Sequence, residues 1–150
     1  MNENLPGTEV VDSGTTSGVR WWVTRMDRIG LPKDIQYNGY VELPDEHPIM
    51  ILGASYSVAD KFLDAYKGIT YANGNIVGFD TNHYGDSESI WPITAVRWET
   101  INLAQQVHDT NTEEHRATAR QALGLRNQIK EALTALESLG FSTYDLDIYL

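Results

Sequence analysis

The chain of 150 residues contains no cysteine, which excludes disulfide bonds and every thiolate metal or redox site. It also lacks any hydrophobic run near the roughly 20 residues that a membrane-spanning helix needs. The first 18 residues have neither the basic segment nor the apolar run of a signal peptide. We therefore expect a cytoplasmic protein with no membrane partner.

Positive charge is also scarce. The chain has 11 Lys and Arg against 21 Asp and Glu, which gives a formal net charge of -10 and an isoelectric point near 4.6. Binding to nucleic acid depends on clustered Lys and Arg that neutralise phosphates, so we expect no direct nucleic-acid partner. An acidic surface can instead imitate nucleic acid and block a basic groove on another protein.

The size and composition of the chain fit one domain. With 150 residues and 41% hydrophobic content, it is large enough to bury a core without metal or disulfide support. Residues 1–18 are rich in Ser, Thr and Gly and predict a flexible N-terminal arm. Residues 19–150 predict a single domain.

Local patterns predict an α+β fold, with a small, mainly antiparallel sheet packed against two C-terminal helices, the last one long. Asn73-Gly74-Asn75 between two apolar runs predicts a β-hairpin. Trp91 and Trp98 are expected to seal the first long helix onto the sheet. The expected strands are residues 20–26, 40–43, 69–72 and 76–80, and the expected helices are residues 57–66 capped by Ser57, one capped by Thr94, and residues 113–139.

The helix predicted over residues 113–139 is long for so small a sheet. Ile129, Leu133 and Leu136 form its apolar stripe, and Gly140 is expected to end it. Because such a helix extends beyond its own core, we expect its exposed half to pair with a second copy in a homodimer or larger assembly.

The densest group of polar side chains lies at residues 78–86, directly after the last expected strand. Asp80, His83 and Asp86 are spaced three residues apart in this loop. One interpretation is structural: both carboxylates accept backbone N–H groups, the imidazole donates to one of them, and Gly85 supplies a positive φ. The same residues also suit two functional interpretations, and the sequence leaves all three open.

The first functional interpretation is a recognition loop for a small polar molecule. Asn82 and His83 would contact the ligand beside the two carboxylates, and Tyr71 or Tyr84 would stack on it. A nucleotide-like ligand also needs a phosphate contact. Arg116 and Arg120, one helical turn apart, would form a clamp for it, although Glu113 is near enough in sequence to pair with them instead.

The second functional interpretation is a metal centre. Carboxylate and imidazole groups suit zinc or manganese, so Asp80, His83 and Asp86 would act with His47 in a metal-dependent hydrolase, with Asp45 and Glu46 available to complete the shell. No established ligand signature such as His-Glu-x-x-His is present. The chain also lacks a serine nucleophile elbow, a phosphate-binding loop and a dinucleotide fingerprint, so we expect no cofactor.

Three sequence blocks resemble those of a widespread group of small bacteriophage and prophage accessory proteins. The blocks are YVELPDEHP at residues 40–48, GITY at residues 68–71 and GFDTNHYGD at residues 78–86. In the family the second block begins two residues earlier, usually with histidine where this chain has Tyr66 and with glycine where it has Lys67. The absent histidine weakens the metal interpretation.

The resemblance implies a phage setting rather than a reaction. Small phage proteins without a structural role often belong to the genes that act on the host. In that setting we expect a protein that acts by binding, most simply in counter-defence, either by inhibiting a host immune protein or by sequestering a nucleotide-like signal.

Overall fold

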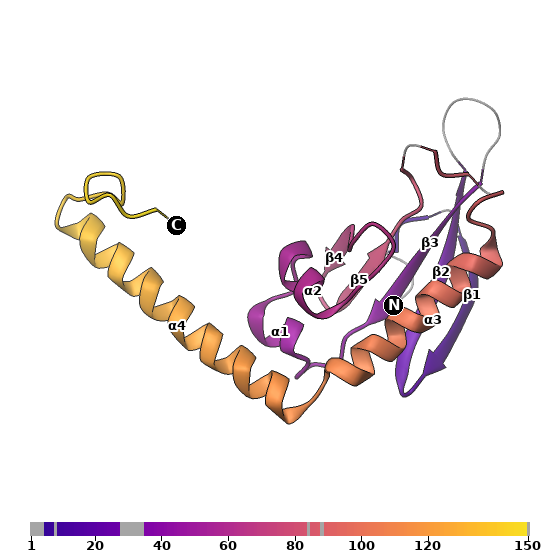
Figure 1. The fold of residues 1–150 in the computed structure, drawn as a ribbon, viewed down its shortest axis with the longest axis horizontal. Coiled ribbons are helices and arrows are strands. Elements are labelled where there is room, and N and C mark those ends of the chain that lie inside the picture. Colours follow the sequence, from indigo (N-terminus) through magenta and orange to yellow (C-terminus); the bar gives the residue numbers. More distant parts are fainter. Residues whose placement is uncertain (1–4, 8, 28–34, 84, 88, 150) are drawn as a thin grey trace.

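The structure is a computed structural model that describes residues 5–7, 9–27, 35–83, 85–87 and 89–149. It has the expected α+β fold, with one antiparallel sheet and a long C-terminal helix (Figure 1). In chain order the elements are β1 (Glu9–Thr16), β2 (Val19–Asp27), β3 (Ile35–Glu42), α1 (Pro48–Leu52), α2 (Tyr56–Phe62), β4 (Tyr71–Asn73), β5 (Ile76–Phe79), α3 (Ile93–Thr110) and α4 (Glu113–Ser138). We call everything before α4 the head.

The sheet has five strands in the order β1-β2-β3-β5-β4, and all neighbours are antiparallel. The predicted hairpin is confirmed as β4 and β5. Asn73 pairs with Ile76, so the turn itself consists of Gly74 and Asn75, and Gly74 has a φ of 59° that glycine adopts without strain. The hairpin ends at Phe79 and delivers the loop over residues 80–86.

The flexible N-terminal arm was a wrong prediction for residues 9–16, which form the edge strand β1. This strand pairs with β2 through a turn at Ser17 and Gly18, both of which have positive φ. The Ser, Thr and Gly residues that suggested a linker are therefore hairpin residues. Val10, Val11 and the threonines supply the β-propensity that the composition obscured.

Helix α3 covers one face of the sheet and forms the core with it. It packs on β1, β2 and β3, and the inward side chains of the strands are almost fully buried. Gly39 allows the closest approach, because a Cβ atom there would collide with the Thr100 hydroxyl and the Phe79 ring. The core consists of Val19, Trp21, Val23, Val41, Val77 and Phe79 from the sheet, together with Val96, Leu103, Ala104 and Val107 from α3.

The opposite, outer face of the sheet carries polar and aromatic side chains beneath the N-terminal segment. The Pro6 carbonyl accepts hydrogen bonds from the Thr24 hydroxyl at 2.7 Å and the Tyr40 hydroxyl at 3.1 Å. Burial raises the pKa of Tyr40 above its ordinary value. Residues 5–7 thus satisfy buried hydroxyl groups that a bare sheet face would expose to water.

Two short helices follow β3, and the first was not predicted. His47 caps α1: its Nδ1 accepts the N–H of Ile49 at 3.1 Å. Helix α2 spans fewer residues than the expected 57–66, and its cap is Ser55 rather than Ser57. The pattern located the helix but shifted its start, because serine occurs at both positions and either one can cap.

Helix α3 also differs from its prediction at its start. Its N-cap is Pro92, so Thr94 lies inside the helix. Trp91 is partly buried against the core and packs on Tyr66 of the loop before β4, with ring centroids 4.1 Å apart. Trp98 does not seal the helix, because 68% of it is exposed.

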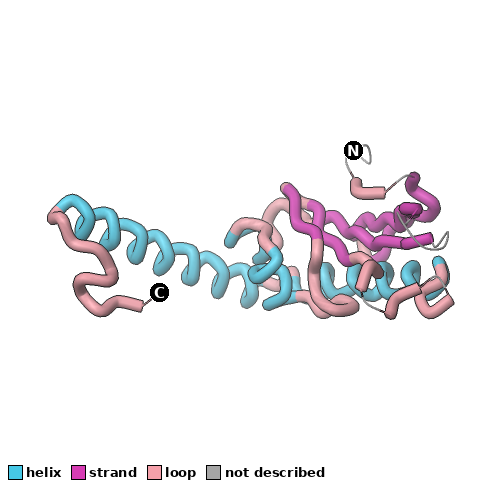
Figure 2. The backbone as a smooth tube through the Cα atoms, turned by 90° about the horizontal axis from the view of Figure 1, so that it is seen from above, coloured by secondary structure: helices cyan, strands magenta, loops and turns pink. Residues whose placement is uncertain are grey.

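Helix α4 leaves the head and projects away from it (Figures 1 and 2). Thr112 caps its start, and its first half packs on α1, where Ala119 is buried. It ends as predicted: Gly140 has a φ of 83°, and its N–H and that of Phe141 bond back to Glu137 and Leu136. Among the described residues, no helix combines the length and the apolar character needed to cross a bilayer.

Replacing Gly39 by alanine is expected to lower the free energy of unfolding by about 1–3 kcal/mol, because the added methyl group overpacks the contact between β3 and α3. Urea denaturation measures the loss. Gly53→Ala is the control for alanine at a glycine with open space, although its positive φ adds a backbone strain of its own. A Gly39→Ala protein as stable as wild type would contradict the packing described here.

Candidate functional site

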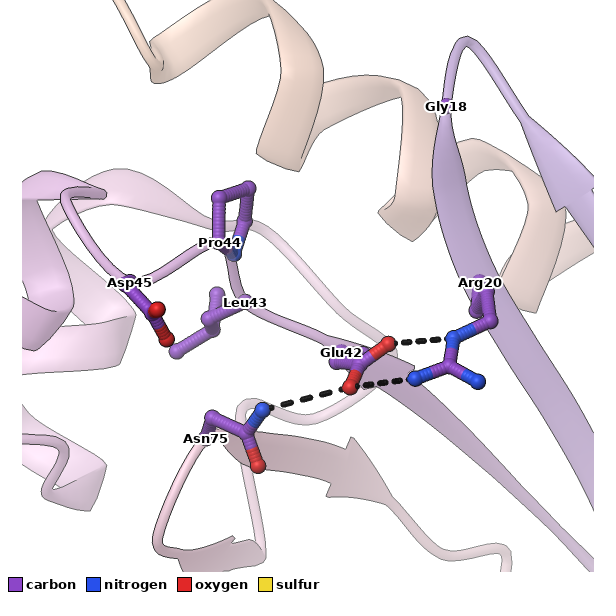
Figure 3. Close-up of a pocket in the computed structure, with 7 residues that line it drawn as sticks. All are labelled: Gly18, Arg20, Glu42, Leu43, Pro44, Asp45 and Asn75. Carbon is purple, nitrogen blue, oxygen red and sulfur yellow. Dashed lines mark hydrogen bonds and ion pairs between the residues drawn. The ribbon is translucent and has the colours of Figure 1, made fainter.

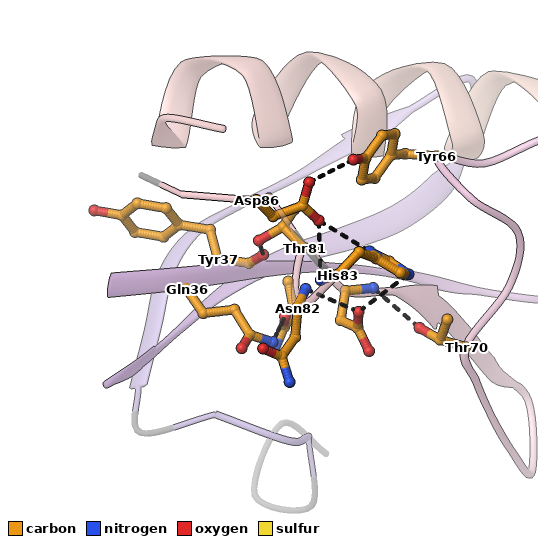
Figure 4. Close-up of polar contacts among 10 residues, drawn as sticks. Gln36, Tyr37, Tyr66, Thr70, Thr81, Asn82, His83 and Asp86 are labelled. Atoms are coloured by element: carbon orange, nitrogen blue, oxygen red, sulfur yellow. Dashed lines mark hydrogen bonds and ion pairs between the residues drawn. The ribbon is translucent and has the colours of Figure 1, made fainter. Parts of the chain in front are cut away.

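The loop after β5 is built around the buried carboxylate of Asp86. Its Oδ1 accepts the Tyr66 hydroxyl at 2.5 Å, and its Oδ2 accepts the backbone N–H of His83 at 3.1 Å (Figure 4). Nδ1 of the His83 ring lies 2.9 Å from the same Oδ2. Three groups thus hold one carboxylate that is only 9% exposed.

This environment determines the ionisation of Asp86. Burial works to raise its pKa, but the hydrogen bonds from Tyr66 and His83 outweigh burial and hold the pKa below the ordinary value of a carboxyl group. Asp86 is therefore ionised at neutral pH, and it favours the tautomer of His83 with the proton on Nδ1. Nε2 of that ring then faces Asp80, 3.8 Å from its Oδ1.

Asp80 completes the turn. Its Oδ1 accepts the N–H of Asn82 at 3.1 Å, and its own N–H donates to the Thr70 hydroxyl at 3.0 Å, which ties the loop to the residue directly before β4. Gly85 has a φ of 87°. These bonds are those of the structural interpretation, in which the acids accept backbone N–H groups and the imidazole fixes the loop.

Tyr66 is the residue of this network that the sequence did not identify. It lies in the loop between α2 and β4, twenty residues before Asp86. No local pattern links the two positions. Tyr66 belongs to the site only through its tertiary contact with Asp86. Its ring also packs against Trp91 and makes an edge-to-face contact with His83 at 5.5 Å.

Replacing Tyr66 by phenylalanine is expected to cost about 1–2 kcal/mol of stability, because Asp86 loses a donor in a buried position. The pKa of Asp86 should rise towards its ordinary value, so the variant should lose less additional stability than wild type as the pH falls from neutral through the acid range. Urea denaturation over that range tests both effects. Tyr144→Phe, on an exposed tyrosine, is the matched control.

Some of the predicted contact residues retain unused hydrogen-bonding capacity. Tyr71 lies opposite Gly78 on the outer face, so Asp80 is its diagonal neighbour on that face. The Tyr71 ring rests edge-on against Tyr40, with centroids 5.3 Å apart. Within the described part of the chain, Oδ2 of Asp80 and the side-chain amide of Asn82 have no hydrogen-bond partner.

The metal alternative does not gather its donors. His47 is fully buried at the start of α1, where Nδ1 caps the helix and Nε2 lies 3.0 Å from the Thr110 hydroxyl. It contacts neither Asp80 nor His83, and neighbouring Asp45 and Glu46 are exposed. Over residues 5–7, 9–27, 35–83, 85–87 and 89–149, no group of three potential ligands could hold a metal ion.

The arginine clamp is likewise separate from the loop. Arg116 bonds the carbonyl and the side chain of Asn111, and both Arg116 and Arg120 lie 3.2 Å from Glu113. Both arginines therefore pair with Glu113, the partner that the sequence analysis gave as the alternative to a phosphate. The loop leads into the start of α3 whereas Asn111 follows its end, and the 18 residues between span about 27 Å. One small ligand cannot readily bridge that distance within one chain.

A hollow of about 270 Å³ lies on the head beside the start of β2 and the end of β3 (Figure 3). Arg20 crosses it and holds Glu42 in two parallel bonds, and Asn75 donates to the same carboxylate at 3.3 Å. The hydrogen bond and the charge of Glu42 raise the pKa of Arg20. Arg20 and Glu42 neutralise each other, so among the described lining residues the Asp45 carboxylate is the charge without an ion-pair partner, and it would repel an anionic ligand.

Comparison with protein-family models, curated proteins and solved structures gave no match. The likeness to phage accessory proteins therefore stays a hypothesis from the three sequence blocks. Tyr84, named as a second stacking residue, lies outside the described residues. The loop after β5 and the outer face of the sheet are the features of the structure that bear on function.

Proposed function

We propose that this chain is a phage accessory protein that acts by binding, and that it holds a nucleotide-like ligand by its base at the edge formed by Tyr71, Asp80 and Asn82. The observation that carries the proposal is the unused acceptor of Asp80 beside an aromatic ring and a free amide. His83, 23% exposed at its side chain, borders the same edge.

The chemistry of these groups favours a base over a phosphate. An aromatic ring offers a stacking surface, and a carboxylate accepts N–H donors such as those of a purine amino group. Asp80 and Asp86 repel a phosphate, so the phosphate of a bound nucleotide would point away from the loop. In a phage setting, such binding would withdraw a nucleotide signal from host immunity.

Binding is better supported than hydrolysis. Nδ1 of His83 is committed to Asp86, and its Nε2 lies beside Asp80 rather than open to a substrate. The remaining metal candidate, His47, is enclosed in the core. The metal-dependent hydrolase therefore has no donor set of three within the described residues.

Isothermal titration calorimetry with each ribonucleoside monophosphate tests the proposal. We expect binding of at least one, with an affinity reduced about tenfold or more by Asp80→Asn and by Tyr71→Ala. Asp45→Asn, at an exposed carboxylate of the head, is the matched control and should bind as wild type does. Arg116→Ala with Arg120→Ala should also leave the affinity unchanged.

Two outcomes would overturn the proposed function, and a third would change the residues assigned to the site. The absence of binding to every nucleotide would exclude a nucleotide ligand. Turnover of a phosphoester in the presence of zinc or manganese, lost in His83→Ala, would favour the hydrolase instead. A drop in affinity in the double arginine variant would restore the clamp.

The inhibition of a host immune protein is the second candidate, and the charge distribution favours it. In the sequence before α4, residues 1–112 contain 15 acidic and 7 basic residues, whereas α4 contains four of each. The acidity therefore belongs to the head, where it would suit a basic groove on a target. Such binding should weaken steeply with added salt, unlike the stacking of a base.

A further inference from the structure

The projecting part of α4 presents an apolar stripe that the head does not cover. Leu125 is 53% exposed, Ile129 49% and Leu139 72%. Ala119 and Arg126 face α1, and at about 100° per residue the stripe is centred roughly a quarter turn around the helix from them. Its members are Ala122, Leu125, Ile129, Ala132, Leu136 and Leu139; Leu133, which the sequence pattern placed in the stripe, is partly buried and lies nearer the side of the helix that faces α1.

The spacing of these residues is that of a coiled coil. Successive members are separated by three, four, three, four and three residues, as the a and d positions of a heptad require. A helix that presented this stripe only to water would gain nothing from the pattern, since exposed apolar side chains contribute little to a helix alone.

The order of small and large side chains along the stripe favours an antiparallel partner of the same sequence. In an antiparallel pair centred between Ile129 and Ala132, Ala122 meets Leu139, Leu125 meets Leu136, and Ile129 meets Ala132. Each alanine then faces a large side chain, which fills the interface evenly. A parallel pair in register would instead place alanine against alanine and leave voids.

Charge favours the same arrangement. Lys130, Glu131 and Glu137 have no ion-pair partner within the described residues. In the antiparallel register, Glu137 of one copy comes within about two residues of the level of Arg126 of the other, on the same side of the stripe. A parallel pair in register would leave Glu137 eleven residues, about 16 Å, from the level of Arg126 of the other copy and on the opposite side of the seam, so the two could not pair.

We propose that two copies of this chain form an antiparallel dimer through this stripe of α4, with the two heads at opposite ends. The proposal is independent of the ligand at the loop, because the stripe and the loop share no residue. It makes a second copy, rather than a host protein, the occupant of the stripe.

Analytical ultracentrifugation of the full chain over a range of concentrations tests the association. We expect a dimer of twice 16.9 kDa, whose dissociation constant rises about 100-fold or more in Leu125→Glu or Ile129→Glu, since a charge is buried in the interface. Asn127→Glu adds the same charge on the opposite side of the helix and should leave the dimer intact. Far-ultraviolet circular dichroism and urea denaturation check that each variant retains its fold.

The absence of cysteine makes a clean test of orientation possible. A Leu125→Cys chain mixed with a differently tagged Leu136→Cys chain should oxidise to a disulfide between the two, and Leu125→Cys alone should stay uncoupled. Coupling of Leu125→Cys to itself would overturn the antiparallel arrangement. A chain that stays monomeric at every concentration would overturn the dimer and leave the stripe to a different protein.

Discussion

Replacing Phe79 by alanine is expected to lower the free energy of unfolding by about 3–5 kcal/mol. Phe79 is 1% exposed at the end of β5, and its ring lies against Gly39 on the inner face of the sheet. Truncation leaves a cavity that the rigid contact between β3 and α3 cannot close. A domain with a total stability of about 5–15 kcal/mol would lose a large share of it.

The same substitution should weaken the proposed ligand edge, because Phe79 directly precedes Asp80. Urea denaturation measures the stability, and nucleotide titration at a temperature where the variant remains folded measures the binding. Tyr144→Ala removes an aromatic ring that is 84% exposed, and it should change neither. A Phe79→Ala protein that loses less than about 1 kcal/mol would show that the hairpin end is not anchored in the core.

The elements that the sequence predicted correctly are those specified by neighbouring residues. The β4–β5 hairpin follows from Asn-Gly between apolar runs, and the end of α4 follows from Gly140. Both signals act over a few positions and need no knowledge of the rest of the chain. The loop over residues 80–86 is similar, since its bonds from backbone N–H groups to carboxylates join residues two or three apart.

The features that the sequence did not predict depend instead on contacts between residues far apart in the chain. Strand β1 is stabilised by its pairing with β2 and by an ion pair from Asp12 to Arg97 of α3, neither of which a Ser, Thr and Gly composition reveals. Tyr66 reaches Asp86 only in the folded chain. His47 suggested a metal ligand because its chemistry permits one, whereas the fold uses both ring nitrogens for structure. Long-range contacts decide these cases, and a single sequence does not show them.

His47 is expected to make the protein about 3 kcal/mol less stable near pH 4 than near neutral pH, through its own titration alone. Burial lowers the pKa of this imidazole from 6.5 to about 4, and the positive charges of His115 and Arg116 act in the same direction. A proton on Nδ1 would also point at the N–H of Ile49 and break the cap of α1.

The direction of this pH dependence follows from comparing the titration of His47 in the folded and unfolded states. In the unfolded chain His47 takes up its proton as the pH falls below about 6.5, but in the folded chain only below about 4. Between these values the unfolded state binds more protons, so the stabilisation is complete above about pH 6.5 and is lost as the pH falls towards about 4. Carboxylates such as Asp86 add their own loss at lower pH.

Urea denaturation of wild type and His47→Asn at a series of pH values isolates this contribution. Asparagine keeps an oxygen that can cap α1 but does not titrate, so the variant should be less stable at neutral pH and should lose less further stability towards pH 4. His108→Asn replaces an exposed histidine, and its curve should run parallel to that of wild type until the acid range in which Asp109 takes up a proton, because the hydrogen bond from His108 lowers the pKa of Asp109. If His47→Asn also runs parallel, then the imidazole is not held neutral by its burial, and the cap of α1 must tolerate the charged ring.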